Sequence, residues 1–220
     1  MRLDIININE LKNGFETFIK LLPPKRRKKA CRYVKMEDRL RSLGGGLLMR
    51  AVLGVKSDED IVYGQHAKPC LRYGELHFNL SHSGDYVILV SGACRLGVDI
   101  EKISNFESAV ARRCFTDQEC AELFKTAQNT KESNLLFFKL WTAKESIMKA
   151  SGLGFNLPPE SFTVIPFEDM PCRVNGEEWF LKWNIINGHI YCLAAEYTPD
   201  FIDCKLWSAD ELNKILSEDF

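Results

Sequence analysis

The pattern of apolar and polar residues predicts that β-strands occur in two groups along the chain. Strand-like runs in the first half cover residues 2–8, 76–81, 86–91 and 96–103. Those in the second half cover residues 161–165, 179–186 and 189–196. The connections between the later strands are short and carry glycine, and Asn187-Gly188 is a strong signal for a two-residue hairpin. Residues 76–81, 86–91 and 96–103 are therefore predicted to form one antiparallel three-stranded meander, and the three runs of the second half are predicted to form another.

Apolar residues at helical spacing predict helices ahead of each meander. The predicted helical segments are 10–22, a basic segment from Pro23-Pro24 to about residue 52, 107–113, 117–127, 131–150 and a short helix from Ser208. Thr116 with Glu119 and Ser208 with Glu211 are predicted capping boxes, and Gly152 is predicted to end the segment 131–150. Proline suits the first turn of a helix, which is why we begin the second segment there. Gly44, Gly45 and Gly46 lie inside this segment, and glycine weakens a helix interior. We therefore expect either a break or a close backbone approach at these glycines.

The order of elements predicts the fold class and the domain organisation. Helices followed by a meander occur twice, and this order predicts an α+β fold of two similar lobes. We expect an N-terminal lobe of residues 1–105 and a C-terminal lobe of residues 106–220. A chain of 220 residues is long enough for two packed lobes of this size.

Composition points to a globular protein of the cytoplasm. Apolar residues make up 45% of the chain and the formal net charge is −1. No run approaches the roughly 18 apolar residues of a membrane span, and residues 1–20 lack the pattern of a signal peptide. We therefore expect no membrane association. The eight cysteines form no Cys-x-x-Cys pair and no zinc spacing with histidine, so we expect reduced thiols.

Positive charge is concentrated between Lys25 and Arg41. This stretch contains nine lysines and arginines, and Glu37 and Asp38 are its only acidic residues. Such a helix predicts a local anion-binding surface. A nucleic-acid-binding protein that uses residues 25–41 is one alternative, although the chain lacks the overall basic charge of that class.

Two short stretches carry candidate metal chemistry. Asp99 and Glu101 are two residues apart in a predicted strand, so their side chains leave the same face. Glu145 and Lys149 are four residues apart in a predicted helix and share a face there. Taken alone, each pair is more often part of a solvent-exposed face than of a metal site. Together, three carboxylates and a lysine suit magnesium held against a phosphate.

Three segments of the chain resemble the signature blocks of the 4'-phosphopantetheinyl transferases. They are Phe78–Ser83 (FNLSHS), Gly97–Glu101 (GVDIE) and Trp141–Lys149 (WTAKESIMK). Length and the N-terminal lobe resemble the double-lobed, surfactin-synthetase-activating type, and the similarity extends from about residue 23 to 196. The resemblance implies two lobes related by a pseudo-twofold axis, with the active site at their interface. It implies transfer of the phosphopantetheine arm of coenzyme A to a carrier-protein serine, which releases adenosine 3',5'-bisphosphate.

The resemblance also assigns roles to individual residues. It implies that Asp99, Glu101 and Glu145 bind Mg²⁺, with Mn²⁺ as the alternative ion, and that Glu145 and Lys149 are catalytic. The residues that it implies for coenzyme A binding are Arg26, Lys29, Lys68, Ser81, His82 and Lys149, with Lys25 and Lys28 as the alternative register of the basic helix.

Partners follow from the same resemblance. They are coenzyme A and an acidic apo carrier, either an acyl or a peptidyl carrier of polyketide and nonribosomal peptide biosynthesis, and the enzyme itself is expected to be a monomer that binds no nucleic acid. A non-catalytic relative that only binds coenzyme A or a carrier is the second alternative. Such a relative should lack at least one of the three carboxylates, all of which are present here.

Overall fold

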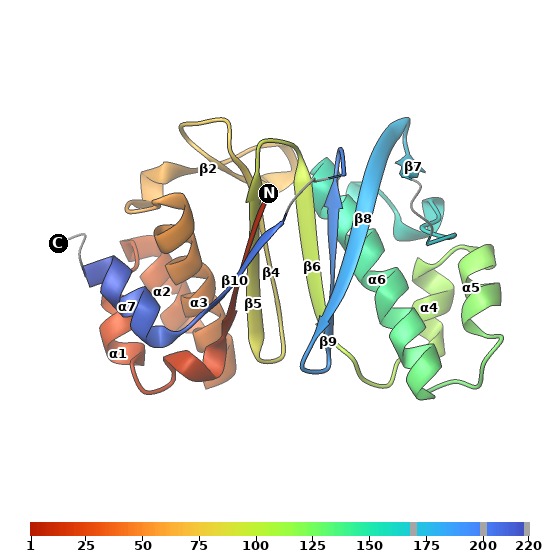
Figure 1. Cartoon of the computed structure of the whole chain (residues 1–220), viewed down its shortest axis with the longest axis horizontal. Helices are drawn as coiled ribbons and strands as arrows, with labels where there is room; N and C mark the ends of the chain where they lie inside the picture. Colours follow the sequence, from red (N-terminus) through yellow and green to blue (C-terminus); the bar gives the residue numbers. More distant parts are fainter. Residues whose placement is uncertain (168–170, 199–201, 218–220) are drawn as a thin grey trace. The chain divides into compact units, whose positions relative to one another are not determined.

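The structure is a computed structural model that describes residues 1–167, 171–198 and 202–217 (Figure 1). Contacts between Cα atoms divide the chain into two compact units. The first unit comprises Met1–Ala93 with Phe201–Phe220, and the second comprises Cys94–Asp200. Each unit is described by itself.

The first unit is built on a four-stranded sheet with the order β10-β1-β5-β4. Its strands are β1 (Arg2–Asn7), β4 (His77–Ser83), β5 (Tyr86–Gly92) and β10 (Asp203–Trp207). The β10 strand is parallel to β1, whereas the other neighbours are antiparallel. A separate hairpin joins β2 (Ile61–Tyr63) to β3 (Pro69–Leu71).

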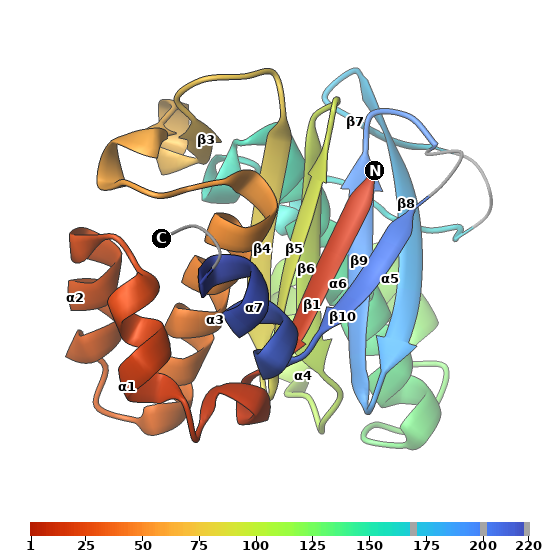
Figure 2. The same ribbon diagram turned by 60° about the vertical axis from the view of Figure 1, so that its left-hand side comes forward.

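Helices cover one face of this sheet (Figure 2). They are α1 (Phe15–Phe18), α2 (Pro24–Arg32), α3 (Met36–Leu53) and α7 (Ala209–Ser217), with 3-10 turns at Ile8–Leu11, Ile19–Leu21, Asp58–Asp60 and Gln65–Ala67. The helix predicted over residues 10–22 is therefore divided into short pieces. The helix predicted to begin at Pro24 and the capping box of Ser208 with Glu211 are both confirmed.

The three glycines of α3 lie within an unbroken helix. The interruption between α2 and α3 falls at residues 33–35 instead. A Cβ atom on Gly46 would lie 2.7 Å from a methyl carbon of Leu22, and one on Gly45 would lie 3.1 Å from Leu80. A break at these glycines was therefore the wrong alternative. They allow close packing, and side chains rather than backbone approach them.

The second unit contains an antiparallel sheet with the order β6-β9-β8-β7. Its strands are β6 (Leu96–Lys102), β7 (Cys172–Val174), β8 (Glu177–Ile186) and β9 (His189–Ala195), and its helices are α4 (Ser108–Cys114), α5 (Asp117–Leu123) and α6 (Lys131–Ser151), with 3-10 turns at Gly154–Asn156 and Pro159–Ser161. Asn187 and Gly188 have φ angles of 43° and 73°, as the predicted hairpin requires. The capping box of Thr116 with Glu119 is also confirmed.

The α+β class is confirmed, but several strand pairings differ from prediction. The β6 strand pairs with β9 in the second unit, so the predicted meander of β4, β5 and β6 is wrong. The β10 strand, which apolar periodicity did not predict, returns to the first unit beside β1. The expected lobes were residues 1–105 and 106–220. The two compact units instead divide between Ala93 and Cys94, and the C-terminal segment belongs to the first unit. Residues 161–165 form no strand, and β7 takes the third place in the second meander.

Helix α6 packs closely on the second sheet at Gly97. A Cβ atom at this position would lie 2.2 Å from the carbonyl oxygen of Ser146 and 2.5 Å from the amide nitrogen of Ala150. Both atoms belong to the backbone of α6, which cannot move like a flexible side chain. The Ser146 hydroxyl also donates to the carbonyl of Cys192 in β9 at 2.8 Å. Only glycine at position 97 allows α6 to lie this close to the sheet.

In the described part of the chain, no helix carries an apolar stretch long enough to cross a bilayer.

Replacing Gly97 with alanine tests this packing. We expect Gly97→Ala to lower the free energy of unfolding by at least about 2 kcal/mol, because overpacking against backbone forces the helix away. The matched control is Gly64→Ala, whose Cβ would lie 3.7 Å from the nearest atom and should be tolerated. Urea denaturation measures both variants. Equal stability of the two alanine variants would contradict the close approach.

Candidate functional site

The acidic residues of β6 face α6. Because side chains alternate along a strand, Asp99 and Glu101 leave the same face as Gly97, and Gly97 lies against α6. That helix carries Glu145 and Lys149 one turn apart. The strand and the helix therefore present the predicted acids and the predicted lysine toward one another.

An ion pair joins the two elements. The Lys149 ammonium donates to Oδ1 of Asp99 at 2.6 Å and to the carbonyl of Val98 at 3.3 Å. Asp99 is buried, whereas 27% of the Lys149 side chain remains exposed. The ammonium thus lies on the Asp99 carboxylate, and the Lys149 side chain remains partly exposed to solvent.

The charges of Asp99 and Lys149 also affect the pKa of Glu145. Burial raises the pKa of the Glu145 carboxyl, and the negative charge of Asp99 raises it further, while Lys149 opposes the rise. Asp99 and Glu145 are thus close enough for their charges to repel one another. A cation beside them would relieve this repulsion.

The donor set fits a hard divalent ion that is completed by other oxygens. Among the described residues, no group of three or more histidine, cysteine, aspartate or glutamate side chains is close enough to form a metal site by itself. Mg²⁺ does not need such a cage, because it commonly uses one or two carboxylates together with water and substrate phosphates. Asp99 and Glu145 can supply those carboxylates. Glu101 lies on the same face of β6 as Asp99, so it is the third candidate.

Basic side chains of the first unit line two neighbouring cavities. Arg26 and Lys29 of α2 contribute to both. The larger cavity, of roughly 320 Å³, is lined by Pro23, Lys25, Arg26, Lys29, Val55, Ser57, Asp58, Glu59, Ile61, Tyr63 and Arg72. The smaller, of roughly 80 Å³, is lined by Arg26, Lys29, Tyr33, Asp38, Arg41, Ser42, Gly45, Leu80 and His82. Burial lowers the pKa of Arg26, although arginine remains charged at neutral pH.

The other residues that the resemblance implies for coenzyme A binding are distributed unevenly around these cavities. His82 and Leu80 share one face of β4 and line the smaller cavity. Ser81 is buried on the opposite face of the strand, so it does not join His82 there. Lys68 directly precedes β3 and lies outside both linings. Of the alternative register, Lys25 lines the larger cavity and Lys28 lines neither.

Arg41 also lines the smaller cavity, although the sequence analysis did not include it among the residues for coenzyme A binding. Its guanidinium donates to Asp38 and to the carbonyl of Gly84, and these bonds hold it at the cavity wall. The positive charge concentrated between Lys25 and Arg41 was the sequence feature that could have identified it. The packing of α2 against α3, rather than helical spacing, brings Arg41 beside Arg26 and Lys29.

Comparisons with known proteins identify the family of the chain. Residues 9–94 match the model of the N-terminal region of 4'-phosphopantetheinyl transferases, and residues 95–202 match that of the 4'-phosphopantetheinyl transferase superfamily. The 4'-phosphopantetheinyl transferase Sfp of Bacillus subtilis is 35% identical over 90% of this chain and 92% of its own length. The 4'-phosphopantetheinyl transferase gsp of Aneurinibacillus migulanus is 38% identical over 60% of this chain and 57% of its own length. The chain therefore belongs to the 4'-phosphopantetheinyl transferase superfamily.

Proposed function

We propose that this protein transfers the 4'-phosphopantetheine arm of coenzyme A to a serine of an apo carrier protein in a reaction that depends on a divalent cation. The observation that carries the proposal is the cluster of Asp99, Glu145 and Lys149 on facing surfaces of β6 and α6. Serine attack on the pyrophosphate of coenzyme A places negative charge on phosphoryl oxygens. A lysine beside two carboxylates combines a phosphate donor with oxygen ligands for a cation.

We assign different roles in the reaction to the acidic residues and the lysine of the second unit. Asp99, Glu101 and Glu145 would hold Mg²⁺, with Mn²⁺ as the alternative, and the ion would neutralise charge on the pyrophosphate. Lys149 can exchange its bond to Asp99 for one to a phosphoryl oxygen, because part of its side chain is exposed. Glu145, or a water polarised by Glu145 and the ion, is the proposed base for the serine proton.

The basic cavities of the first unit suit the phosphates of coenzyme A. Arg26 and Lys29 supply positive charge to both cavities, and His82 and Arg41 add donors to the smaller one. Lys68 and Ser81 remain proposed coenzyme A-binding residues, although neither lines these cavities. Arginine forms paired hydrogen bonds to phosphate oxygens, which makes Arg26 and Arg41 suitable partners for a terminal phosphate.

The cytoplasm is the proposed location, and an acidic carrier is the proposed partner. All eight cysteines, which lie within the described residues, are free thiols, as is usual in a reducing compartment. We propose that the enzyme acts as a monomer on a carrier domain whose negative charge steers it to the protein.

Incubation with coenzyme A and a panel of apo carrier proteins tests the function directly. We expect one carrier serine to gain one phosphopantetheine arm when Mg²⁺ or Mn²⁺ is present, and we expect no transfer in excess chelator. Intact-mass spectrometry of each carrier measures the transfer. Undiminished transfer in chelator would remove the metal from the proposal, and no transfer to any carrier would contradict the function.

Neutralising the carboxylates tests the acidic cluster. We expect Asp99→Asn and Glu145→Gln each to lower kcat by at least about 100-fold, because each removes a charged oxygen ligand from a site that has few. The matched control is Glu132→Gln, which changes an exposed carboxylate of the same helix. Circular dichroism establishes that each variant is folded. A folded variant with near-normal turnover would exclude its residue from the site.

Removing charge from α2 tests the basic cavities. We expect Arg26→Ala with Lys29→Ala to raise the KM for coenzyme A at least about tenfold with a smaller change in kcat, because the lost bonds hold the substrate before and during the reaction. The control is Arg32→Ala with Lys35→Ala, which removes the same charge from exposed positions outside the cavity linings. Equal increases in KM for the two double variants would mean that only the net charge of the basic segment matters.

A further inference from the structure

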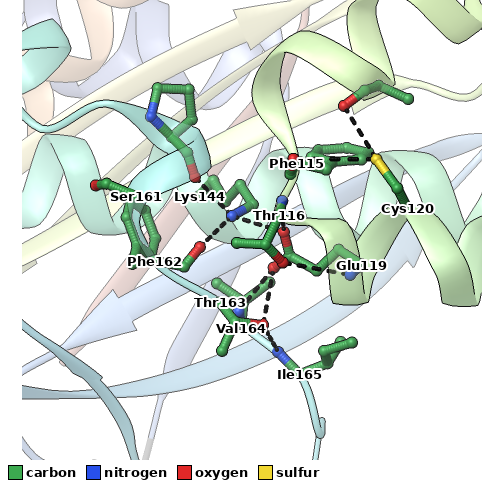
Figure 3. Close-up of polar contacts among 12 residues, drawn as sticks. Phe115, Thr116, Glu119, Cys120, Lys144, Ser161, Phe162, Thr163, Val164 and Ile165 are labelled. Atoms are coloured by element: carbon green, nitrogen blue, oxygen red, sulfur yellow. Dashed lines mark hydrogen bonds and ion pairs between the residues drawn. The ribbon is translucent and has the colours of Figure 1, made fainter.

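Lys144 belongs to the same sequence block as Glu145, but it points into the core of the second unit (Figure 3). Only 1% of its side chain is exposed. Its ammonium has three partners: Oε2 of Glu119 at 2.8 Å, the carbonyl of Pro159 at 2.7 Å and the carbonyl of Phe162 at 2.5 Å. An ammonium has three N–H donors, so these partners use all of them. Lys144 therefore has no donor left for a substrate.

Glu119 is equally enclosed, and its side chain is fully buried. One carboxylate oxygen accepts from the Lys144 ammonium and from the amide of Thr116 at 2.9 Å. The other accepts from the amide of Val164 at 2.8 Å and from the Thr163 hydroxyl at 3.3 Å. Two carboxylate oxygens offer about four acceptor positions, and four donors fill them.

The pair joins three parts of the second unit that share no backbone ladder. Glu119 lies in the first turn of α5, Lys144 lies in the middle of α6, and the remaining partners lie between Pro159 and Val164. This last segment contains a 3-10 turn and no strand. Its position relative to α6 therefore depends strongly on the bonds to Lys144 and Glu119.

We propose that the Lys144–Glu119 pair is a positioning pair that orients Glu145, a role that rests on the proposed function. Successive side chains of a helix leave it about 100° apart, so the direction of Lys144 determines the direction of Glu145. Directional bonds from Lys144 to Glu119 of α5 and to the carbonyls of Pro159 and Phe162 oppose rotation and sliding of α6 relative to these neighbours. The packing of Gly97 holds α6 at its distance from β6, and the ion pair fixes its rotation.

This role can be separated from a contribution to stability alone. A buried ion pair can often be replaced by apolar residues of similar size without loss of stability, whereas removal of one partner leaves a buried charge and destabilises the protein. An apolar pair packs without directional bonds, so it does not restore the orientation of the helix. Displacement of a reacting group by about 1 Å can lower a rate by about 100-fold.

Two variants test the proposal at a temperature at which both are folded. Glu119→Gln leaves the Lys144 charge buried without a counter-ion and should lower Tm by roughly 10 °C. The double variant Lys144→Met with Glu119→Leu leaves no buried charge and should recover part of that loss; the remainder reflects the backbone groups of Thr116, Pro159, Phe162 and Val164 that lose their partners. For both we expect kcat to fall at least about tenfold, while the Kd for coenzyme A, measured by calorimetry without carrier, stays within about twofold of wild type.

Lys139→Met is the matched control, because Lys139 is a partly buried lysine of the same helix whose ammonium lies over the rings of Phe167 and Trp183. It should keep the wild-type kcat. A stable double variant with wild-type kcat would overturn the proposal and reduce the pair to a stabilising role. A rise in the coenzyme A Kd that matches the fall in kcat would overturn it as well. Absence of transfer by the wild-type protein would instead overturn the proposed function, and this inference with it.

Discussion

The absence of a side chain at Gly97 is the constraint on which the candidate site of the second unit depends. A Cβ atom there would overlap the backbone of α6, so only glycine lets the helix lie directly on β6. The bond from Ser146 to the carbonyl of Cys192 adds a second attachment to the sheet. Because strand side chains alternate, the residues that follow on the same face reach the helix, and Asp99 meets Lys149 at 2.6 Å. The meeting of Asp99 with Lys149 therefore depends on this close approach of α6 to β6.

Two lysines of α6 form ion pairs with very different properties. Lys144 and Glu119 are enclosed, and their hydrogen-bonding capacity is used within the protein. Lys149 and Asp99 form a pair in which the lysine remains partly exposed and can change partners. A buried and saturated pair is costly to disturb and suits a structural task, whereas an accessible pair suits ligand exchange. One short sequence block thus contains the lysine that we propose for positioning and the lysine that we propose for phosphate binding.

Local sequence signals predicted the local structure well. The hairpin at Asn187-Gly188, the capping boxes and the long helix that ends at Gly152 depend on neighbouring residues, and all are present. Pairings between distant strands were predicted less well, because apolar alternation identifies a strand without identifying its neighbour. The β6 strand follows β5 closely in sequence, yet it pairs with β9. Residues 161–165 have a strand-like pattern, but Glu119 and Lys144 bind their backbone in place of a neighbouring strand.

The sequence by itself determined which chemical groups are present and which family the chain resembles, because residue types and the spacing of short blocks can be read without a structure. The tertiary structure alone decided which of these groups face one another. It placed Lys144 in the core and Lys149 beside Asp99, and it brought Arg41 beside Arg26. The physical reason is that side-chain direction depends on the rotation of each helix and on the sheet that each strand joins. Both are set by contacts between residues far apart in the chain.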